Sequence, residues 1–122
     1  AQELVLKRNR SGHYVAPGAI NGQPVTFLLD TGATLVSVPA PLGPTLGLVP
    51  GAQGTAQTAN GSVAIRLTTI DHLTLGPFQL RGVRAALSPG REEDQVLLGM
   101  SVLKQLEFTQ RGNTLILRPH RS

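Results

Sequence analysis

Short apolar runs separated by turn residues recur along the whole chain, a pattern typical of short β-strands joined by tight turns. The segment ELVLKRN, residues 3–9, predicts a first strand. Two longer apolar stretches flank Asn21 and Gly22, and this pair predicts a hairpin because both residues tolerate a positive φ. Pro24 predicts an edge position at that point, since proline has no amide hydrogen to give to a neighbouring strand.

The next segment opens with a run that is almost wholly apolar, VTFLLD at 25–30. Such a run predicts a strand buried on both faces. TLVSVP, at 34–39, predicts another short strand. Four prolines then interrupt residues 39–51, which leaves room for at most one helical turn, around Thr45–Leu48.

Apolar and polar residues alternate in the stretch that follows, so Val63, Ile65 and Leu67 fall on one face of a predicted strand. This stretch contains a second Asn-Gly pair, Asn60-Gly61, which predicts a second hairpin. FQLRGVRAALS predicts a further pair of strands or one bent strand, and SPGREEDQ predicts a polar loop after it.

The last part of the chain combines strands with a helix. Val96–Leu98 suit a buried strand, whereas Met100, Leu103 and Leu106 repeat at three-residue spacing and predict a short helix. A turn at RGN and a final strand ending at Pro119 follow. The total of eight to ten short strands and one helix predicts an all-β barrel or sandwich.

The length of 122 residues corresponds to one domain, which we place at 1–122. The net charge of +4 belongs to basic residues scattered along the sequence, and only four residues are aromatic. A stacking surface for nucleic acid is therefore disfavoured. No run approaches the ~20 apolar residues of a membrane-spanning helix.

The chain has no cysteine, which excludes disulfides and thiol chemistry. Its histidines, His13, His72 and His120, lie far apart with no acid at ligand spacing. We therefore predict no metal site and no cofactor. Serine catalysis is also disfavoured, because Ser37 and Ser101 lack the Gly-x-Ser-x-Gly context of a nucleophile elbow.

Asp30 stands directly after the apolar run and is followed by three small residues, Thr31, Gly32 and Ala33. Burying a carboxylate without a partner is energetically unfavourable. Asp30 is therefore held by hydrogen bonds or placed for chemistry. The simpler interpretation is an Asx-type turn, in which the carboxylate accepts a hydrogen bond from its own loop.

Three segments together resemble the retropepsin-like aspartic proteases, in particular their bacterial single-domain branch. They are the strand that ends in DTGA at 30–33, the hairpin around NG at 60–61, and LLG at 97–99 followed by a helix. The phrases GHYVAPGAINGQPVTFLLDTGA and LLGMSVL carry the resemblance, which extends from about Leu4 to Pro119. It implies an all-β fold: a closed retropepsin-like acid-protease barrel with one short C-terminal helix.

The resemblance implies an aspartic endopeptidase that hydrolyses peptide bonds with a water activated between two carboxylates. The chain has one Asp-Thr-Gly motif, because Asp71 and Asp94 lack the small neighbours. We therefore expect a homodimer in which a two-fold axis brings Asp30 of each copy together. The pair would hold a single proton and act as general base and general acid in turn.

The family's roles carry over to the matching positions of this chain. The threonine and glycine of the motif support the aspartate, and the hairpin closes over the peptide as a flap. The LLG segment packs beneath the Asp30 loop and shapes substrate pockets. Two positions depart from the retroviral pattern, since Thr34-Leu35 replace the polar pair that grips the peptide backbone. The implied catalytic residues are Asp30, Thr31 and Gly32, and the implied substrate-binding residues are Ala33, Thr34, Ala59, Asn60, Gly61, Leu97 and Leu98.

The dimer geometry and the location of the protein are further expectations. In retroviral relatives both chain ends interleave into one intersubunit sheet, and here ELVLKRN and NTLILRP could do so, unless another face is used. The start at Ala1-Gln2, the lack of cysteine and the frequent export of the family favour a bacterial periplasm or cell envelope. Removal of an N-terminal signal or anchor is compatible with that start.

Two other functions are weighed against the protease. A non-catalytic dimeric peptide-binding module of the same fold is the nearer alternative, although the intact Thr31 and Gly32 favour an enzyme. A phosphoryl-transfer enzyme with Asp30 as nucleophile needs a parallel α/β scaffold and a magnesium site built from further aspartates. The sequence offers neither.

Overall fold

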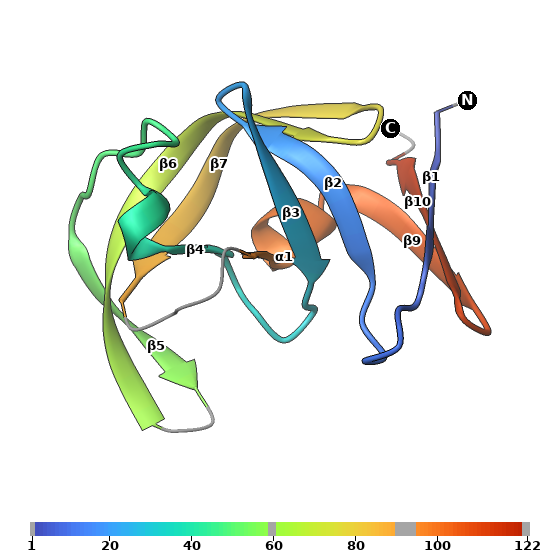
Figure 1. Ribbon diagram of the computed structural model, residues 1–122, viewed down its shortest axis with the longest axis horizontal. Helices are drawn as coiled ribbons and strands as arrows, with labels where there is room; N and C mark the ends of the chain where they lie inside the picture. The colour runs from blue at the N-terminus through green and yellow to red at the C-terminus, as the bar shows by residue number, and fades with distance from the viewer. Residues whose placement is uncertain (1, 59–60, 90–94, 121–122) are drawn as a thin grey trace.

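The computed structural model describes residues 2–58, 61–89 and 95–120. Strands dominate these residues, which confirms the predicted all-β class (Figure 1). The described part contains no helix that is long and apolar enough to cross a membrane. The elements are β1 (Leu4–Lys7), β2 (Val15–Ile20), β3 (Gln23–Leu29), β4 (Val36–Pro39), the 3₁₀ turn η1 (Ala40–Leu42), β5 (Gln53–Thr58), β6 (Gly61–Leu75), β7 (Phe78–Ser88), β8 (Val96–Leu98), α1 (Met100–Leu103), β9 (Leu106–Arg111) and β10 (Thr114–Pro119).

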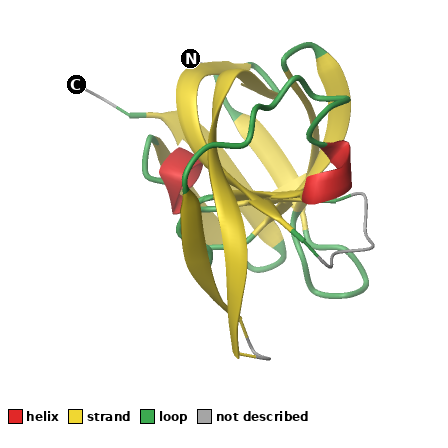
Figure 2. Ribbon diagram, turned by 90° about the vertical axis from the view of Figure 1, so that its left-hand side faces the viewer, coloured by secondary structure: helices red, strands yellow, loops and turns green. Residues whose placement is uncertain are grey.

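The larger sheet closes into a barrel, as predicted. Its strands follow the order β2-β3-β8-β4-β7-β6, and β6 returns to pair with β2, with Ile20 opposite Leu73. β5 is the terminal strand of this sheet and pairs with β6. The β5–β6 hairpin projects beyond the body of the barrel in both ribbon views (Figures 1 and 2).

The β2–β3 hairpin confirms the turn predicted at the first Asn-Gly pair. Asn21 has φ 50° and Gly22 has φ 83°, as a two-residue hairpin turn requires. The Asn21 side chain also fixes the turn to its surroundings, because its Nδ2 donates to Leu46 O at 2.8 Å and its Oδ1 accepts from the His72 amide at 3.1 Å. Pro24 lies where β3 pairs with β2 alone among the described strands, since β8 joins β3 further along.

β7 is one bent strand, one of the two forms predicted for its sequence. Val83, Ala85 and Leu87 are buried in one half, whereas Phe78 is buried in the other. Along the strand, the inward side therefore changes from even to odd positions. Gly82, with φ 62°, lies at the point of change and supplies a backbone conformation that other residues rarely adopt.

β3 corrects one expectation about burial. Phe27 is fully buried, but Thr26 is exposed and Leu28 and Leu29 are half-buried. The expectation of a strand buried on both faces is therefore wrong for this chain. A barrel strand turns one face to the interior, and the described residues only partly cover the other face of β3.

One of the two helical expectations needs correction. The helix predicted from Met100, Leu103 and Leu106 ends at Leu103, and Leu106 instead begins β9. Gln105 donates its amide hydrogen to Val102 O at 2.9 Å, which tightens the last turn before the chain becomes extended. Hydrogen-bonded turns lie where one helical turn was expected, around Thr45–Leu48, because Leu46 donates its amide hydrogen to Leu42 O at 3.0 Å and Gly47 donates to Pro44 O at 3.2 Å. The 3₁₀ turn η1 directly precedes them.

The ends of the described chain form a second, smaller sheet. Its order is β1-β10-β9, with all pairs antiparallel. The predicted terminal strands thus pair with each other within one chain, with Leu4 opposite Leu117. Leu117 in turn lies opposite Phe108 of β9. Both edges of β10 are occupied, so a retroviral interleaving of this strand with a second copy would require these pairs to open.

Candidate active site

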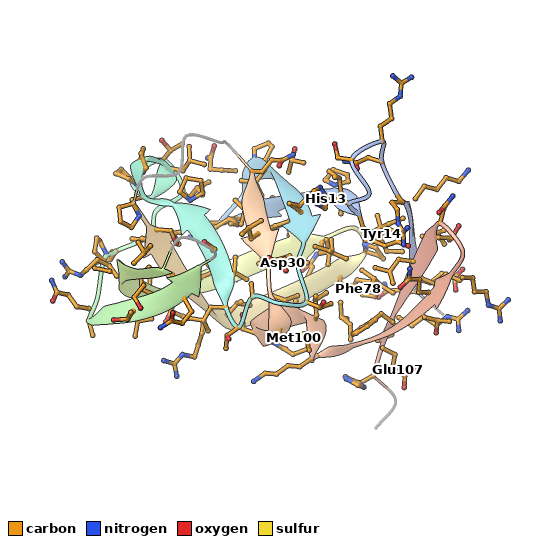
Figure 3. The ribbon with its side chains drawn as sticks, turned by 90° about the horizontal axis from the view of Figure 1, so that it is seen from below. His13, Tyr14, Asp30, Phe78, Met100 and Glu107 are labelled. Carbon is orange, nitrogen blue, oxygen red and sulfur yellow. The ribbon has the colours of Figure 1, made fainter. Side chains whose placement is uncertain are left out.

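Asp30 lies where β3 ends beside β8. These two strands run parallel, with Leu29 opposite Leu98, and the Asp30 amide donates to Leu98 O at 3.1 Å. The Asp30 side chain is half-buried. Seen from below, Asp30 lies near the centre of this face of the molecule (Figure 3). The buried strand pair therefore fixes the position of the carboxylate.

The loop after β3 holds one oxygen of the Asp30 carboxylate. The Gly32 amide donates to Asp30 Oδ1 at 2.9 Å, and the Ala33 amide donates to Asp30 O at 3.1 Å. The Asx-type turn that the sequence suggested as the simpler interpretation is therefore present. No other hydrogen bond reaches this carboxylate from the described residues, so the turn leaves Oδ2 available for chemistry.

The start of α1 clamps the loop from behind. Met100 N–H donates to Ala33 O at 2.8 Å, and Ser101 N–H donates to Thr34 O at 2.9 Å. The first amides of a helix have no partner within the helix, so the loop carbonyls satisfy them. Gly99 permits this approach, because a Cβ there would lie 2.2 Å from Leu35 O.

Ser101 ties the end of the loop to β7. Its Oγ accepts from the Val36 amide at 3.2 Å and donates to Arg84 O at 3.0 Å. The residue is 9% exposed. Sequence analysis weighed Ser101 only as a nucleophile and missed this positioning role. The available signal was a serine within the otherwise apolar segment MSVL.

Ser101→Ala is expected to lower the free energy of unfolding by about 1–3 kcal/mol, because the Val36 amide and the Arg84 carbonyl lose their partner. Urea denaturation followed by circular dichroism measures the change. Ser11→Ala is the matched control, since Ser11 is exposed and should change stability by less than about 0.5 kcal/mol. Equal effects of the two substitutions would show that the Ser101 hydroxyl contributes nothing to holding the loop.

The structure brings the DTGA loop and the LLG segment together. Thr31, Gly32 and Thr34 are exposed in the loop, and Ala33 is half-buried.

The two leucines predicted to bind substrate differ in exposure. Leu98 is 0% exposed and belongs to the core, whereas Leu97 is half-buried and keeps part of its side chain exposed.

The hairpin residues lie apart from this loop. Gly61 begins β6 with φ 108° and pairs with Thr58 of β5. Ala59 and Asn60, also predicted to bind substrate, fall outside the described residues. The β5–β6 hairpin and the loop after β3 extend to the same side of the molecule (Figure 1).

A pocket of about 600 Å³ lies away from the predicted site residues. Asp71 and Arg84 are among its lining, so Asp71 belongs to this pocket and not to the Asp30 loop. Asp94 falls outside the described residues. Within the described ranges, no group of three or more His, Asp or Glu side chains is placed to hold a metal ion.

Residues 16–105 match the protein family described as "gag-polyprotein putative aspartyl protease". The chain belongs to this family. The matched range includes the Asp30 loop, the β5–β6 hairpin and the LLG segment.

A solved structure gives the same result for the fold. The crystal structure of a retropepsin-like aspartic protease from Rickettsia conorii matches with a TM-score of 0.80 and 28% identity, over 95% of this chain and 89% of that one. The predicted resemblance to retropepsin-like aspartic proteases is therefore confirmed. Family and fold together support a hydrolase.

A curated relative extends the comparison without adding a function. It is an uncharacterized protein in the cobV 5' region of Sinorhizobium sp., 32% identical over 121 residues. The match covers 96% of this chain but 52% of the relative. The chain thus spans about half the length of that protein.

Proposed function

We propose that this aspartyl protease family member is an endopeptidase that acts as a homodimer, with one Asp30 from each copy at the two-fold axis. One observation carries the proposal. The Asp30 loop, clamped by β8 and α1, holds one carboxylate oxygen through Gly32 and leaves the other available. Each chain has one Asp-Thr-Gly motif, so a second copy supplies the other carboxylate.

The chemistry follows from two carboxylates that face each other. Like charges about 3 Å apart cannot both ionise, so the pair holds one proton. The ionised carboxylate takes a proton from the water as that water attacks the peptide carbonyl, while the protonated one gives its proton to the carbonyl oxygen. The roles then exchange and the leaving nitrogen is protonated. Because the pair needs one proton, we expect activity in the acidic range.

The peptide substrate is proposed to lie along the exposed side of the Asp30 loop. Ala33 is small enough to let the peptide approach, and Thr34 presents an exposed hydroxyl group. Leu97 of β8 offers apolar surface next to Ser37 of β4. The β5–β6 hairpin would close over the peptide and exclude water. Its proposed substrate-binding residues are Ala59, Asn60 and Gly61.

β9 is the strand that we propose for contact between the two copies. It forms one edge of the terminal sheet, where the described residues provide no partner strand beyond it. Phe108 on β9 is 45% exposed and shares a face with buried Leu117, which lies directly opposite. A second copy paired along this edge would cover Phe108 and extend the sheet.

Phe108→Glu is expected to shift the protein from dimer to monomer and to lower its activity at low protein concentration. A charge at this position opposes burial against a second copy. Analytical ultracentrifugation over a concentration series measures the shift. Thr109→Glu is the matched control, because the neighbouring residue points to the opposite face of β9. Equal dissociation by both substitutions would contradict the proposed contact.

The proposed activity is tested by incubating the purified chain with an unstructured protein at acidic pH, with and without a statine-type inhibitor. Such a compound imitates the tetrahedral intermediate and should bind tightly where the transition state is stabilised. Cleavage that the inhibitor abolishes supports the endopeptidase. Binding of the inhibitor without cleavage of any substrate supports the non-catalytic peptide-binding module instead.

A further inference from the structure

A group of basic residues that are scattered in the sequence lies at one end of the terminal sheet. Four of the eleven basic residues are Lys7, Arg8, Arg10 and Arg111, which we call the basic end. The other seven basic residues equal the seven acidic residues in number. The remainder of the chain therefore has a formal net charge of zero.

The fold gathers these residues at one end of the terminal sheet. Lys7 and Arg111 both lie opposite Thr114, on the two strands that flank β10. Residues in one such row point to the same face, with about 10 Å between the outer backbones. Both side chains are exposed.

The loop after β1 carries the other two basic residues to the same end. The Arg8 amide donates to Asn113 O at 2.8 Å, which fixes the loop beside the β9–β10 turn. Asn9 Oδ1 accepts from the amides of Ser11 and His13 at 3.0 and 2.9 Å, which shapes the loop that carries Arg10. The position of the basic end is therefore set by hydrogen bonds.

The basic end flanks the proposed catalytic loop. The Leu29 amide donates to Tyr14 O at 3.0 Å, which continues the β2–β3 register toward Asp30. The loop between β1 and β2 and the loop after β3 extend to the same side of the molecule (Figure 1).

No acid within the described residues neutralises the basic end. Their one ion pair joins Arg118 to Glu3 at 3.0 Å. Arg118 also lies opposite Glu107, so these charges occupy the other end of the terminal sheet. The Arg8 guanidinium lies over the ring of Tyr14, 5.5 Å from its centroid. Since none of the described acids pairs with the basic end, solvent ions or a binding partner can supply its counter-charge.

We propose that the basic end binds an acidic segment of the protein substrate, outside the peptide bond that is cleaved. This inference rests on the proposed function, because an endopeptidase that uses Asp30 takes a polypeptide as its substrate. Complementary charge would raise the local concentration of acidic chains and guide them to the site. Nucleic acid fits less well, because the Tyr14 ring is half-buried and has Arg8 over it, whereas single strands use open aromatic faces.

The test uses the Asp30→Asn protein, which is designed to bind without cleaving. Fluorescence anisotropy compares two labelled extended peptides, one with a block of Asp and Glu and one with Asn and Gln at the same positions. We expect the acidic peptide to bind about tenfold more tightly at about 50 mM salt, with the advantage mostly lost at about 200 mM. Lys7→Glu with Arg10→Glu should remove that advantage, and neither residue lies on β9.

The matched control is Arg81→Glu with Lys104→Glu, which changes the net charge equally at exposed residues elsewhere. Retained preference for the acidic peptide in this control supports a localised surface. Equal loss in both double variants would overturn the proposal, as would equal affinity of the two peptides for the parent protein. If single-stranded DNA of matched charge binds more tightly, and the Lys7→Glu and Arg10→Glu substitutions remove that binding, the surface would be reassigned to nucleic acid.

This result can be separated from the outcome for the proposed function. Binding is measured on a variant that lacks the catalytic carboxylate, so it does not depend on turnover. If the native chain cleaves proteins but neither peptide is preferred, the inference fails and the protease stands. If the acidic peptide is preferred but the native chain cleaves nothing, the endopeptidase fails and the surface remains one for acidic polypeptides.

Discussion

Asp30→Asn is expected to abolish peptide cleavage while the protein stays folded. Asparagine has nearly the same shape and keeps an oxygen that can accept the Gly32 amide hydrogen, so the loop should be preserved. It cannot take a proton from water, and general acid–base catalysis requires that step. We expect kcat/KM to fall by at least about 10³-fold. Cleavage of a quenched fluorescent peptide at acidic pH measures the loss.

Asp71→Asn is the matched control for this substitution. It removes the same charge from an exposed residue of β6 that lines the separate pocket. We expect its kcat/KM to remain within about twofold of the parent, because surface changes rarely affect a distant site. Cleavage by the pure Asp30→Asn protein at the parent rate would show that the proposed mechanism is wrong.

Gly99→Ala is expected to lower the free energy of unfolding by more than about 3 kcal/mol, or to prevent folding. The added Cβ would lie 2.2 Å from Leu35 O and 2.7 Å from Ala33 O. Both are backbone atoms of a loop that the first amides of α1 hold in place, so neither can move cheaply. Urea denaturation of the purified protein, or its circular dichroism spectrum if it is unfolded, gives the result.

Gly54→Ala provides the comparison within the same chain. A Cβ at Gly54 would meet its nearest neighbour, Ile65, at 3.5 Å, which is ordinary contact. We expect a change of less than about 1 kcal/mol, because neither a clash nor a special backbone angle is involved. Parent-like stability of Gly99→Ala would contradict the close approach of the Asp30 loop to α1.

The elements that sequence predicted well are those fixed by local interactions. Asn21 and Gly22 form the expected turn because their own backbone preferences select it. The end of α1 and the burial of β3 were predicted less well, because both depend on neighbours that are distant in sequence. Leu106 has the right spacing to continue a helix, yet pairing with Pro119 of β10 draws it into a strand.

The candidate site shows the same division. The contact between the DTGA loop and the LLG segment was anticipated through the family resemblance, and the parallel pairing of Leu29 with Leu98 provides it. The positioning role of Ser101 could not be predicted, since its two partners, Val36 and Arg84, come from separate strands. Sequence shows which residues are suited to chemistry, whereas the tertiary contacts decide which of them are held in place.

Mixing the parent protein with the Asp30→Asn variant tests the central claim, that each active site takes one carboxylate from each of two copies. After subunit exchange at a fixed total concentration, activity is measured as the parent fraction is varied. If both carboxylates are needed, activity follows the square of that fraction, and equal parts retain about a quarter of the parent activity. Activity proportional to the fraction, with about half remaining at equal parts, would show that each chain acts alone and would contradict the account.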